Sequence, residues 1–368
     1  MTELKNIRSV SVHRGGGLIL SMDYATLECK IFAAICKDQG LIDVLNSGKD
    51  LHCHTARAVF KELAGLSDKE IKEHYNGLRS KAKGVMFGLL YGKSTYNFAR
   101  DWCCSVEEAQ QVVDGLMGAY PGIKEYVNKQ HQFAIENGYV ENVFQGRRPL
   151  PGAQLPPTGT TKKQFCHAMN AAQNSPIQSS ASIAAWISGS HVQEEFLLQK
   201  MKSVMIGGVH DSTYVDVYPH ELIKAMKIFN YHEQVVPNKI HKWLNGVYLS
   251  ADFGLGQSWG RELDVKSWEL KDGRCILTLK GGNVNWHYLK RELDEAYDYE
   301  ILSIEDGDDI PPNEREDIPI ELSDKYQTVV LSFKDDCPNL EYKSKYYVGN
   351  GYFGPRNDTR ENPIVNAE

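Results

Sequence analysis

The sequence lacks any hydrophobic run long enough to cross a membrane, which excludes a protein anchored by an ordinary transmembrane helix. No stretch of the 368-residue chain approaches about eighteen consecutive apolar residues, and its start, MTELKNIRSV, lacks the hydrophobic segment of a secretory signal. We therefore expect no membrane contact and a cytoplasmic location, which would be the host cytoplasm if a phage encodes the chain.

Cysteine signatures of metal binding are also missing. The eight cysteines form no C-x-x-C pair and show no zinc-type spacing. We expect reduced thiols, most of them filling the core. The hydrophobic fraction of 42% is ordinary for a globular protein, so the chain can form a sizeable core.

A strong positive charge, which is common in nucleic-acid-binding proteins, is absent because the net charge is −7. The charge is uneven, however: residues 1–262 hold 28 Lys/Arg against 25 Asp/Glu, and residues 263–368 hold 13 against 23. We expect residues 1–262 to form a body whose charge allows a polyanion to bind. Residues 263–368 should form an acidic extension. Residues 292–324, with 14 acidic residues and one basic residue, should be disordered or extended. Before this segment, the Lys-Asp-Gly turn at 271–273 and the Gly-Gly turn at 281–282 predict short strands.

The body combines helical and strand patterns, which predicts an α+β fold. The segment GGGLILSM at 15–22 indicates a loop and then a buried strand ending at Asp23, and the alternation in VMIGGVHDSTYVDVY at 204–218 indicates a hairpin. Ser105 and Glu108 have the spacing of a helix capping box. Helical patterns fill residues 27–42, 50–63, 67–100, 105–137 and 164–198.

Two carboxylates, Asp23 and Asp211, are candidates for a metal site. We place each at the edge of a sheet, Asp211 in the second hairpin strand, and the two would converge if their strands are neighbours. Such a pair can hold two Mg²⁺ ions, which prefer oxygen ligands. An aspartate at a strand end is more often a cap or a turn residue. Alternation along the hairpin places Asp216 on the opposite face, so we do not include it.

A stripe of four side chains in RSKAKGVMFGLLYG suits a nucleotide. Arg79, Lys83, Phe87 and Tyr91 follow one another at four-residue intervals, so they lie along one face of a helix. Two cations can bind phosphates and two aromatic rings can contact a sugar and base. The alternative is an amphipathic helix with a solvated basic face and two core aromatics.

These segments together resemble the family A DNA polymerases, the DNA polymerase I-like group. The stretch DYATLE at 23–28 resembles their motif A, Arg79-x3-Lys83-x3-Phe87-x3-Tyr91-Gly92 their motif B, and Val209-His210-Asp211 their motif C, in the family's order. The resemblance covers roughly residues 5–262. Weaker matches are GKDLHCHTARAVF at 48–60, GYVENVFQGRRPLP at 138–151, NSPIQSSAS at 174–182 and GLGQSW at 254–259.

The resemblance implies a polymerase palm of antiparallel strands with helices, with helical fingers over about 60–135. It also implies DNA-directed DNA synthesis from deoxynucleoside triphosphates on a primer-template, with two Mg²⁺ ions and Mn²⁺ as a substitute. Asp23, Asp211 and Lys83 would be catalytic, and Tyr24 would add a carbonyl ligand to the metals. The implied contacts with the incoming nucleotide are Arg79, Lys83, Phe87, Tyr91, Glu28 and His52, and those with DNA are Asn174, Gln178, His210 and Arg147. Without the resemblance, His52 and His210 would be read as structural histidines.

Several positions depart from the family pattern. Ser212 stands where a glutamate usually follows the motif C aspartate, so activity or metal geometry is expected to differ. Lys30 and Asn170 each replace a usual arginine. Phe87 stands where a tyrosine would permit dideoxynucleotides, so the chain should discriminate against them. Glu28 should fill the space beside the sugar 2′ position and exclude ribonucleotides.

Motif A comes after only 22 residues, so we expect the thumb to be absent from this chain. We expect a split polymerase of the phage type, in which a second polypeptide supplies the thumb and a 3′–5′ exonuclease. The strand leading to Asp23 should then form an exposed sheet edge. Two alternatives stay open: a single-subunit RNA polymerase, which Glu28 and Phe87 disfavour, and a polymerase-like DNA-binding or assembly subunit without catalytic activity.

Overall fold

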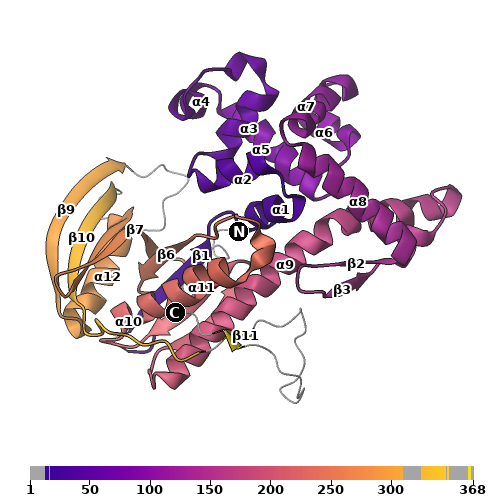
Figure 1. Cartoon of the computed structure of the whole chain (residues 1–368). Coiled ribbons are helices and arrows are strands. Elements are labelled where there is room, and N and C mark those ends of the chain that lie inside the picture. Colours follow the sequence, from indigo (N-terminus) through magenta and orange to yellow (C-terminus); the bar gives the residue numbers. More distant parts are fainter. Residues whose placement is uncertain (1–12, 16, 310–324, 345, 348–363, 366–368) are drawn as a thin grey trace.

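The computed structural model describes residues 13–15, 17–309, 325–344, 346–347 and 364–365, and it is built on one antiparallel sheet with helices around it (Figure 1). The eight strands follow the order β4-β5-β1-β6-β7-β8-β10-β9. Their bounds are β1 Leu18–Tyr24, β4 Val204–Val209, β5 Ser212–Val217, β6 Ala251–Gly256, β7 Glu262–Lys271, β8 Arg274–Gly282, β9 Tyr299–Asp309 and β10 Lys325–Lys334. The α+β class expected from the sequence is confirmed.

Most helices before residue 140 gather into a group on one side of the sheet (Figure 1). The predicted capping box of Ser105 and Glu108 begins α7. The bounds are α1 Leu27–Cys36, α2 Gln39–Asn46, α3 Leu51–Val59, α4 Asp68–His74, α5 Asn76–Leu90, α6 Thr95–Trp102, α7 Val106–Ala119 and α8 Pro121–Asn137, with short 3₁₀ turns elsewhere. Two two-stranded sheets are separate: β2 Tyr139–Glu141 with β3 Arg147–Pro149, and β11 Tyr346–Tyr347 with β12 Ile364–Val365.

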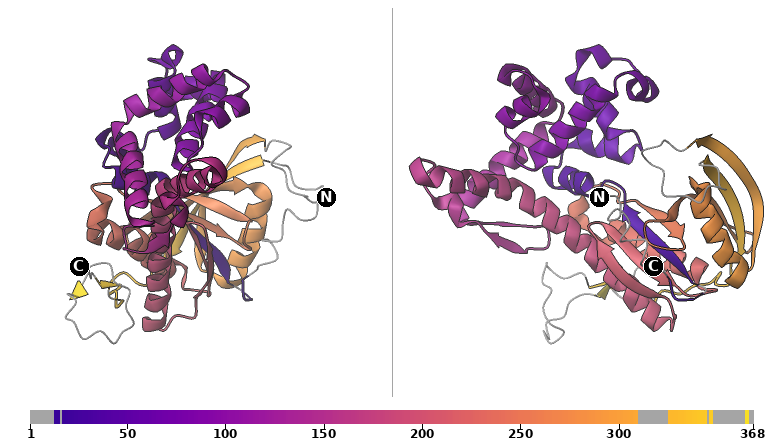
Figure 2. Two further views of the ribbon diagram at one scale, coloured as in Figure 1. Left: turned by 90° about the vertical axis from the view of Figure 1, so that its right-hand side faces the viewer. Right: turned by 180° about the vertical axis from the view of Figure 1, so that it is seen from behind.

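A 37-residue helix, α9 (Lys162–Leu198), connects the two halves. At 1.5 Å per residue it is about 55 Å long. It packs on α1 and α8 in the helical group and on β4 and β5 of the sheet, and both views in Figure 2 show it beside each half. The remaining helices lie against the sheet: α10 Leu222–Phe229, the π-helical segment η5 Asn230–Val235, α11 Val236–Ile240 and α12 Asn283–Ala296.

Strand β1 lies inside the sheet, paired with β5 on one side and β6 on the other. The expectation that it would be an exposed edge is therefore wrong. No local pattern in Ala251–Gly256 predicts pairing with a strand more than 200 residues earlier. Among the described strands, β4 and β9 are the sheet's edges.

The C-terminal extension is β-rich, as expected, but it continues the same sheet. The expected division near residue 262 falls at the start of β7, which pairs with β6. One hydrophobic cluster contains Leu255 from β6, Leu277 from β8 and Leu331 from β10 together with Phe229 from α10. The two parts therefore share one core.

The acidic segment 292–324 is ordered where the structure describes it. It is helical to Ala296 in α12 and forms strand β9, which pairs with β10 along most of its length. Of the two expected outcomes, disordered or extended, residues 299–309 show the extended one as strand β9, because backbone hydrogen bonds to β10 offset the repulsion among its charges. The helix up to Ala296 was not expected. Residues 310–324 lie outside the described residues.

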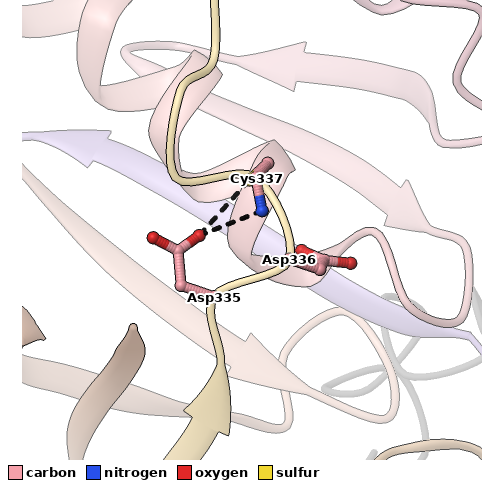
Figure 3. Close-up of side chains that lie close together, drawn as sticks. All are labelled: Asp335, Asp336 and Cys337. Atoms are coloured by element: carbon pink, nitrogen blue, oxygen red, sulfur yellow. Dashed lines mark hydrogen bonds between the residues drawn. The ribbon is translucent and has the colours of Figure 1, made fainter. Parts of the chain in front are cut away.

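The segment after β10 is tied to the helices beneath the sheet. The Lys227 ammonium of α10 lies 2.8 Å from both carboxylate oxygens of Asp335, and both side chains are more than nine-tenths buried. Asp335 also accepts hydrogen bonds from Cys337, beside Asp336 (Figure 3). Further along, the ring of Tyr342 stacks on Tyr231 of η5 with centroids 3.6 Å apart.

All eight cysteines are free thiols, but only three are buried: Cys29, Cys53 and Cys275. Cys36, Cys104 and Cys337 are partly buried and pack against the core clusters, so six of the eight contribute to the core, as expected. Within the part of the chain that the structure describes, no helix combines the length and the apolar character needed to cross a membrane.

Candidate active site

Asp23 and Asp211 come together at one end of β1. Asp23 is opposite Ser212 in the β1–β5 ladder, and the Tyr24 amide donates to the Asp211 carbonyl at 3.3 Å. We expected Asp211 in the second hairpin strand. It lies instead in the two-residue turn, next to His210, which has a φ of 58°. The turn points Asp211 beyond the strand, where it meets the exposed Asp23.

The two carboxylates repel each other. Partial burial of Asp211 and the nearby charge of Asp23 raise the pKa of the Asp211 carboxyl, and Glu28 adds to the rise. The Ser212 hydroxyl donates a hydrogen bond to Asp23. Two carboxylates brought to the same end of β1 offer the oxygen donors that divalent metal ions require, so the residues present fit Mg²⁺.

A third acid, Asp252, lies directly opposite Asp23 on β6, and sequence reasoning missed it. It raises the pKa of the buried Lys30 ammonium, but the larger effect of burial lowers that pKa to about 8. Lys30 donates to the Ser250 hydroxyl at 2.5 Å. We therefore assign Lys30, which replaces the family's arginine, to the support of β6 behind Asp23.

Helix α5 carries the predicted stripe, with Tyr91 as its C-cap residue. The Arg79 guanidinium binds Asp50 at 2.8 Å, and Lys72 binds the same carboxylate at 3.0 Å. Burial alone would raise the pKa of Asp50, but hydrogen bonds from Arg79, the Cys53 amide and Lys72 hold it well below its usual range. Asp50, which also caps α3, thus fixes the position of Arg79.

Beside Arg79, His52 packs against Phe87 of the predicted stripe. Burial lowers the pKa of His52 to about 4, with Lys83 and Arg79 contributing. Its ring lies 5.9 Å from that of Phe87, and the Lys83 ammonium lies 6.0 Å from the Phe87 centroid. The buried Nδ1 of His52 has no hydrogen-bond partner among the described residues, which indicates a place for a ligand.

Tyr91 contacts motif A. Its hydroxyl donates to Glu28 at 2.5 Å, and burial together with this carboxylate raises the pKa of Tyr91 to about 12. Gly92 follows with a φ of 73°, and a Cβ there would lie 2.6 Å from the Asn170 side chain. The glycine is therefore needed both for its backbone conformation and for the close approach of α9.

These elements surround a pocket of about 570 Å³. Of the predicted residues, Glu28, Phe87, Gln178, His210 and Asp211 line it. The other lining residues are Thr26, Leu27, Cys29, Ala181, Ser182 and Trp186. The sequence could have indicated Ser182 and Trp186, because they continue the four-residue spacing of Asn174 and Gln178 along α9.

Two predicted DNA contacts lie outside this pocket lining. Asn174 is half-buried on α9, one turn before Gln178. Arg147 is exposed on β3, where it binds Glu141 at 2.7 Å and lies over the Tyr139 ring. The β2–β3 hairpin packs beside α9, so both residues flank the same helix.

Comparison with known proteins agrees with this arrangement. The model of DNA polymerase family A matches residues 1–261. DNA polymerase I of Caldicellulosiruptor bescii is 33% identical over 219 residues, which are 60% of this chain and 24% of the relative. DNA polymerase I of Lactococcus lactis subsp. cremoris is 31% identical over 261 residues, which are 70% of this chain and 28% of the relative.

A solved structure, the POL domain of Pol1 from M. smegmatis in complex with DNA primer-template and dNTP, has a TM-score of 0.60 and 27% identity. The match covers 69% of this chain and 42% of that one. The chain spans about a quarter of the length of the curated relatives. Motif order, the meeting of Asp23 with Asp211, and these matches lead to one conclusion: the chain belongs to DNA polymerase family A.

Proposed function

We propose that this chain is the catalytic part of a DNA-directed DNA polymerase, which adds deoxynucleotides to the 3′-hydroxyl of a primer. The observation that carries the proposal is the meeting of Asp23 and Asp211 beside a pocket that α5 also lines through Phe87. The cations Arg79 and Lys83 therefore lie on the same helix as Phe87, which lines the pocket together with Asp211. A nucleoside triphosphate with its metal ions has matching charges.

Asp23, Asp211 and the Tyr24 carbonyl would hold two Mg²⁺ ions. When bound, such ions activate an attacking hydroxyl and stabilise the leaving oxygens of phosphoryl transfer. Asp23 lies close enough to Asp211 for its charge to raise the pKa of the Asp211 carboxyl, so one metal-bound ligand could contact both. Ser212, in place of the family's glutamate, leaves this pair intact and orients Asp23 through its hydroxyl.

The residues of α5 and its neighbours would bind the triphosphate. Arg79 is held by Asp50 in a fixed orientation, and Lys83 is exposed and able to donate a proton to the departing pyrophosphate. His52 is neutral at physiological pH, so it would act as a hydrogen-bond donor to a phosphate oxygen. The fingers, over about 60–135, would comprise helices α4 to α8.

Sugar selection would depend on the Glu28–Tyr91 pair and on Phe87. Glu28 lines the pocket while its carboxylate accepts from Tyr91, so a 2′-hydroxyl placed beside it would clash or lose its hydrogen bonds. Phe87 offers no hydroxyl to the pocket, which supports the prediction that dideoxynucleotides are discriminated against. Asn174, Gln178, His210 and Arg147 would contact the primer-template.

A primer-extension assay on the purified full chain tests the proposal. We expect Mg²⁺-dependent extension with deoxynucleotides and little with ribonucleotides. Asp211→Ala should abolish extension while DNA binding, measured by fluorescence anisotropy, remains nearly unchanged. Asp264→Ala is the matched control, because Asp264 is exposed on β7 and binds only Lys266. Binding without extension by the wild-type chain would favour a non-catalytic assembly subunit, and efficient ribonucleotide use would favour an RNA polymerase.

We also propose a second polypeptide that supplies the thumb and the exonuclease. Support comes from edge strand β4, whose Ile206 side chain is 46% exposed. Co-purification from the native source, followed by extension assays with and without the second chain, tests this idea. Processive extension by the purified chain alone would contradict it.

A further inference from the structure

The pocket contains an aromatic side chain that the proposed function does not use. Trp186 of α9 lines the pocket together with His210 and Asp211, and 51% of its surface is exposed. Isolated exposed apolar side chains are common on protein surfaces. This one differs because its ring stands in a concave site next to a candidate catalytic carboxylate, where a ligand can cover it.

Position along the pocket indicates which part of a ligand meets the ring. Phe87 of α5 lines the pocket, and the phosphate-binding cations lie on that helix. Trp186 is two helical turns beyond Gln178, a rise of about 12 Å along α9. If a triphosphate lies along α5 and reacts at Asp211, the nucleotide that carries the attacking hydroxyl has to lie on the other side of Asp211.

We propose that Trp186 packs against the sugar and base of the primer's 3′-terminal nucleotide and so positions its 3′-hydroxyl at Asp211. This inference rests on the proposed polymerase function. It adds a primer-positioning residue that no motif of the sequence contains.

The chemistry of the pocket wall favours a sugar and base over a phosphate. No lysine or arginine is among the described residues that line the pocket, so a phosphate would find no positive side chain there. On the same face of the pocket as Trp186, α9 contributes the small residues Ala181 and Ser182. Outside the lining, Gly208 of β4 leaves room for the indole, because a Cβ there would lie 4.0 Å from the ring. A flat apolar ring beside small residues suits the face of a deoxyribose or the edge of a base.

Photocrosslinking with the full chain tests the contact directly. The primer-template carries 5-iododeoxyuridine as the primer's 3′-terminal base, and Ca²⁺ replaces Mg²⁺ to prevent extension. We expect mass spectrometry to locate the crosslink at Trp186, and moving the photoprobe six nucleotides upstream should remove this crosslink. A terminal-base crosslink that maps to other residues while Trp186 stays unmodified would overturn the inference.

Equilibrium and kinetic measurements provide the second test. Trp186→Ala should weaken primer-template binding without nucleotide by roughly tenfold, the scale of a buried aromatic anchor, and should leave the KM for deoxynucleotides unchanged. Trp186→Phe should restore most of the affinity. Tyr248→Ala is the control, because Tyr248 is similarly exposed at 52% and does not line the pocket.

The outcomes separate this inference from the proposed function. If the wild-type chain neither binds nor extends the primer, the proposed function fails, and the inference fails with it. If the wild-type chain binds and extends but Trp186→Ala does so equally well, only the inference fails. Unchanged DNA binding combined with weaker co-purification of a second polypeptide would assign Trp186 to a protein contact and would also overturn it.

Discussion

Two aspartates in different regions beside the sheet, Asp211 in the β4–β5 turn and Asp335 after β10, have opposite electrostatic environments. At the β4–β5 turn, partial burial and the neighbouring Asp23 raise the pKa of Asp211. Below β10, the Lys227 ammonium and the Cys337 amide lower the pKa of Asp335 despite the opposing effect of burial. The buried charge of Asp335 is thus neutralised by Lys227, whereas at the pocket the like charges of Asp211 and Asp23 lie together. Unsatisfied charge identifies the ligand site, and satisfied charge identifies the scaffold.

The substitution Asp211→Asn should have the largest effect, and it should lower activity without lowering stability. Asp211→Asn removes a metal-binding carboxylate, so we expect extension to fall by roughly a thousandfold or more. Thermal stability at neutral pH should stay equal or rise, because a repelling charge is removed. Initial rates and calorimetry on the same preparation measure both. A variant that unfolds at a lower temperature would show that Asp211 belongs to the scaffold.

The substitution Asp335→Asn should have the opposite pattern, because it should lower stability and leave activity unchanged. It leaves the Lys227 ammonium buried without its counter-charge, so we expect a loss of about 3–5 kcal/mol in the free energy of unfolding. Urea titration followed by circular dichroism measures it. Extension at a temperature where the variant is folded should match wild type. Lys266→Ala, which removes an exposed ion pair with Asp264, should change stability by less than about 1 kcal/mol.

Glu233 in η5 should make the free energy of unfolding depend on pH. Burial raises the pKa of this fully buried carboxyl to about 8, and Asp23 adds to the rise, while the Thr213 hydroxyl opposes it. The unfolded value is about 4.3, so between these values the folded protein holds more protons and stability falls as pH rises. Glu233→Gln should remove this slope.

The expected size of the Glu233 effect is roughly 2–4 kcal/mol between pH 5 and pH 8. Chemical denaturation of wild type and variant at both pH values measures it. Equal slopes in the two proteins would mean that Glu233 titrates normally in the fold. Asp216, Tyr24 and other groups common to both proteins cancel in this difference.

Local sequence patterns predicted the elements of the site better than their partners. The helix of Arg79, the hairpin before Asp211 and the long helix of Asn174 were all predicted, because periodicity and turn residues are local. The pairing of β1 with β6 was not, because a strand's neighbour depends on distant segments. For the same reason, the charge of residues 299–309 suggested a disordered or an extended chain, and only pairing with β10 makes this segment a strand of the sheet.

Side-chain partners were the least predictable part of the site. The sequence singled out Arg79 but did not reveal that Asp50, 29 residues earlier, holds it. Asp252 escaped notice because only the β1–β6 register places it opposite Asp23. Trp186 was not singled out although it continues the four-residue spacing of Asn174 and Gln178, because the spacing alone does not show that this face of α9 lines a pocket.

The smallest predicted effect concerns the hydrogen bond between Tyr91 and Glu28. Tyr91→Phe keeps the ring but removes the donor, so Glu28 loses the contact that holds its carboxylate beside the pocket. A hydrogen bond to a charged group contributes about 1.5–3 kcal/mol, and water replaces part of it because Tyr91 is 42% exposed. We therefore expect ribonucleotide use relative to deoxynucleotide use to rise only about threefold to tenfold. Single-nucleotide kcat/KM values for each sugar measure this ratio, with Tyr96→Phe on α6 as the control. An unchanged ratio would mean that Glu28 selects the sugar by its bulk alone, held by the packing of α1 and not by α5.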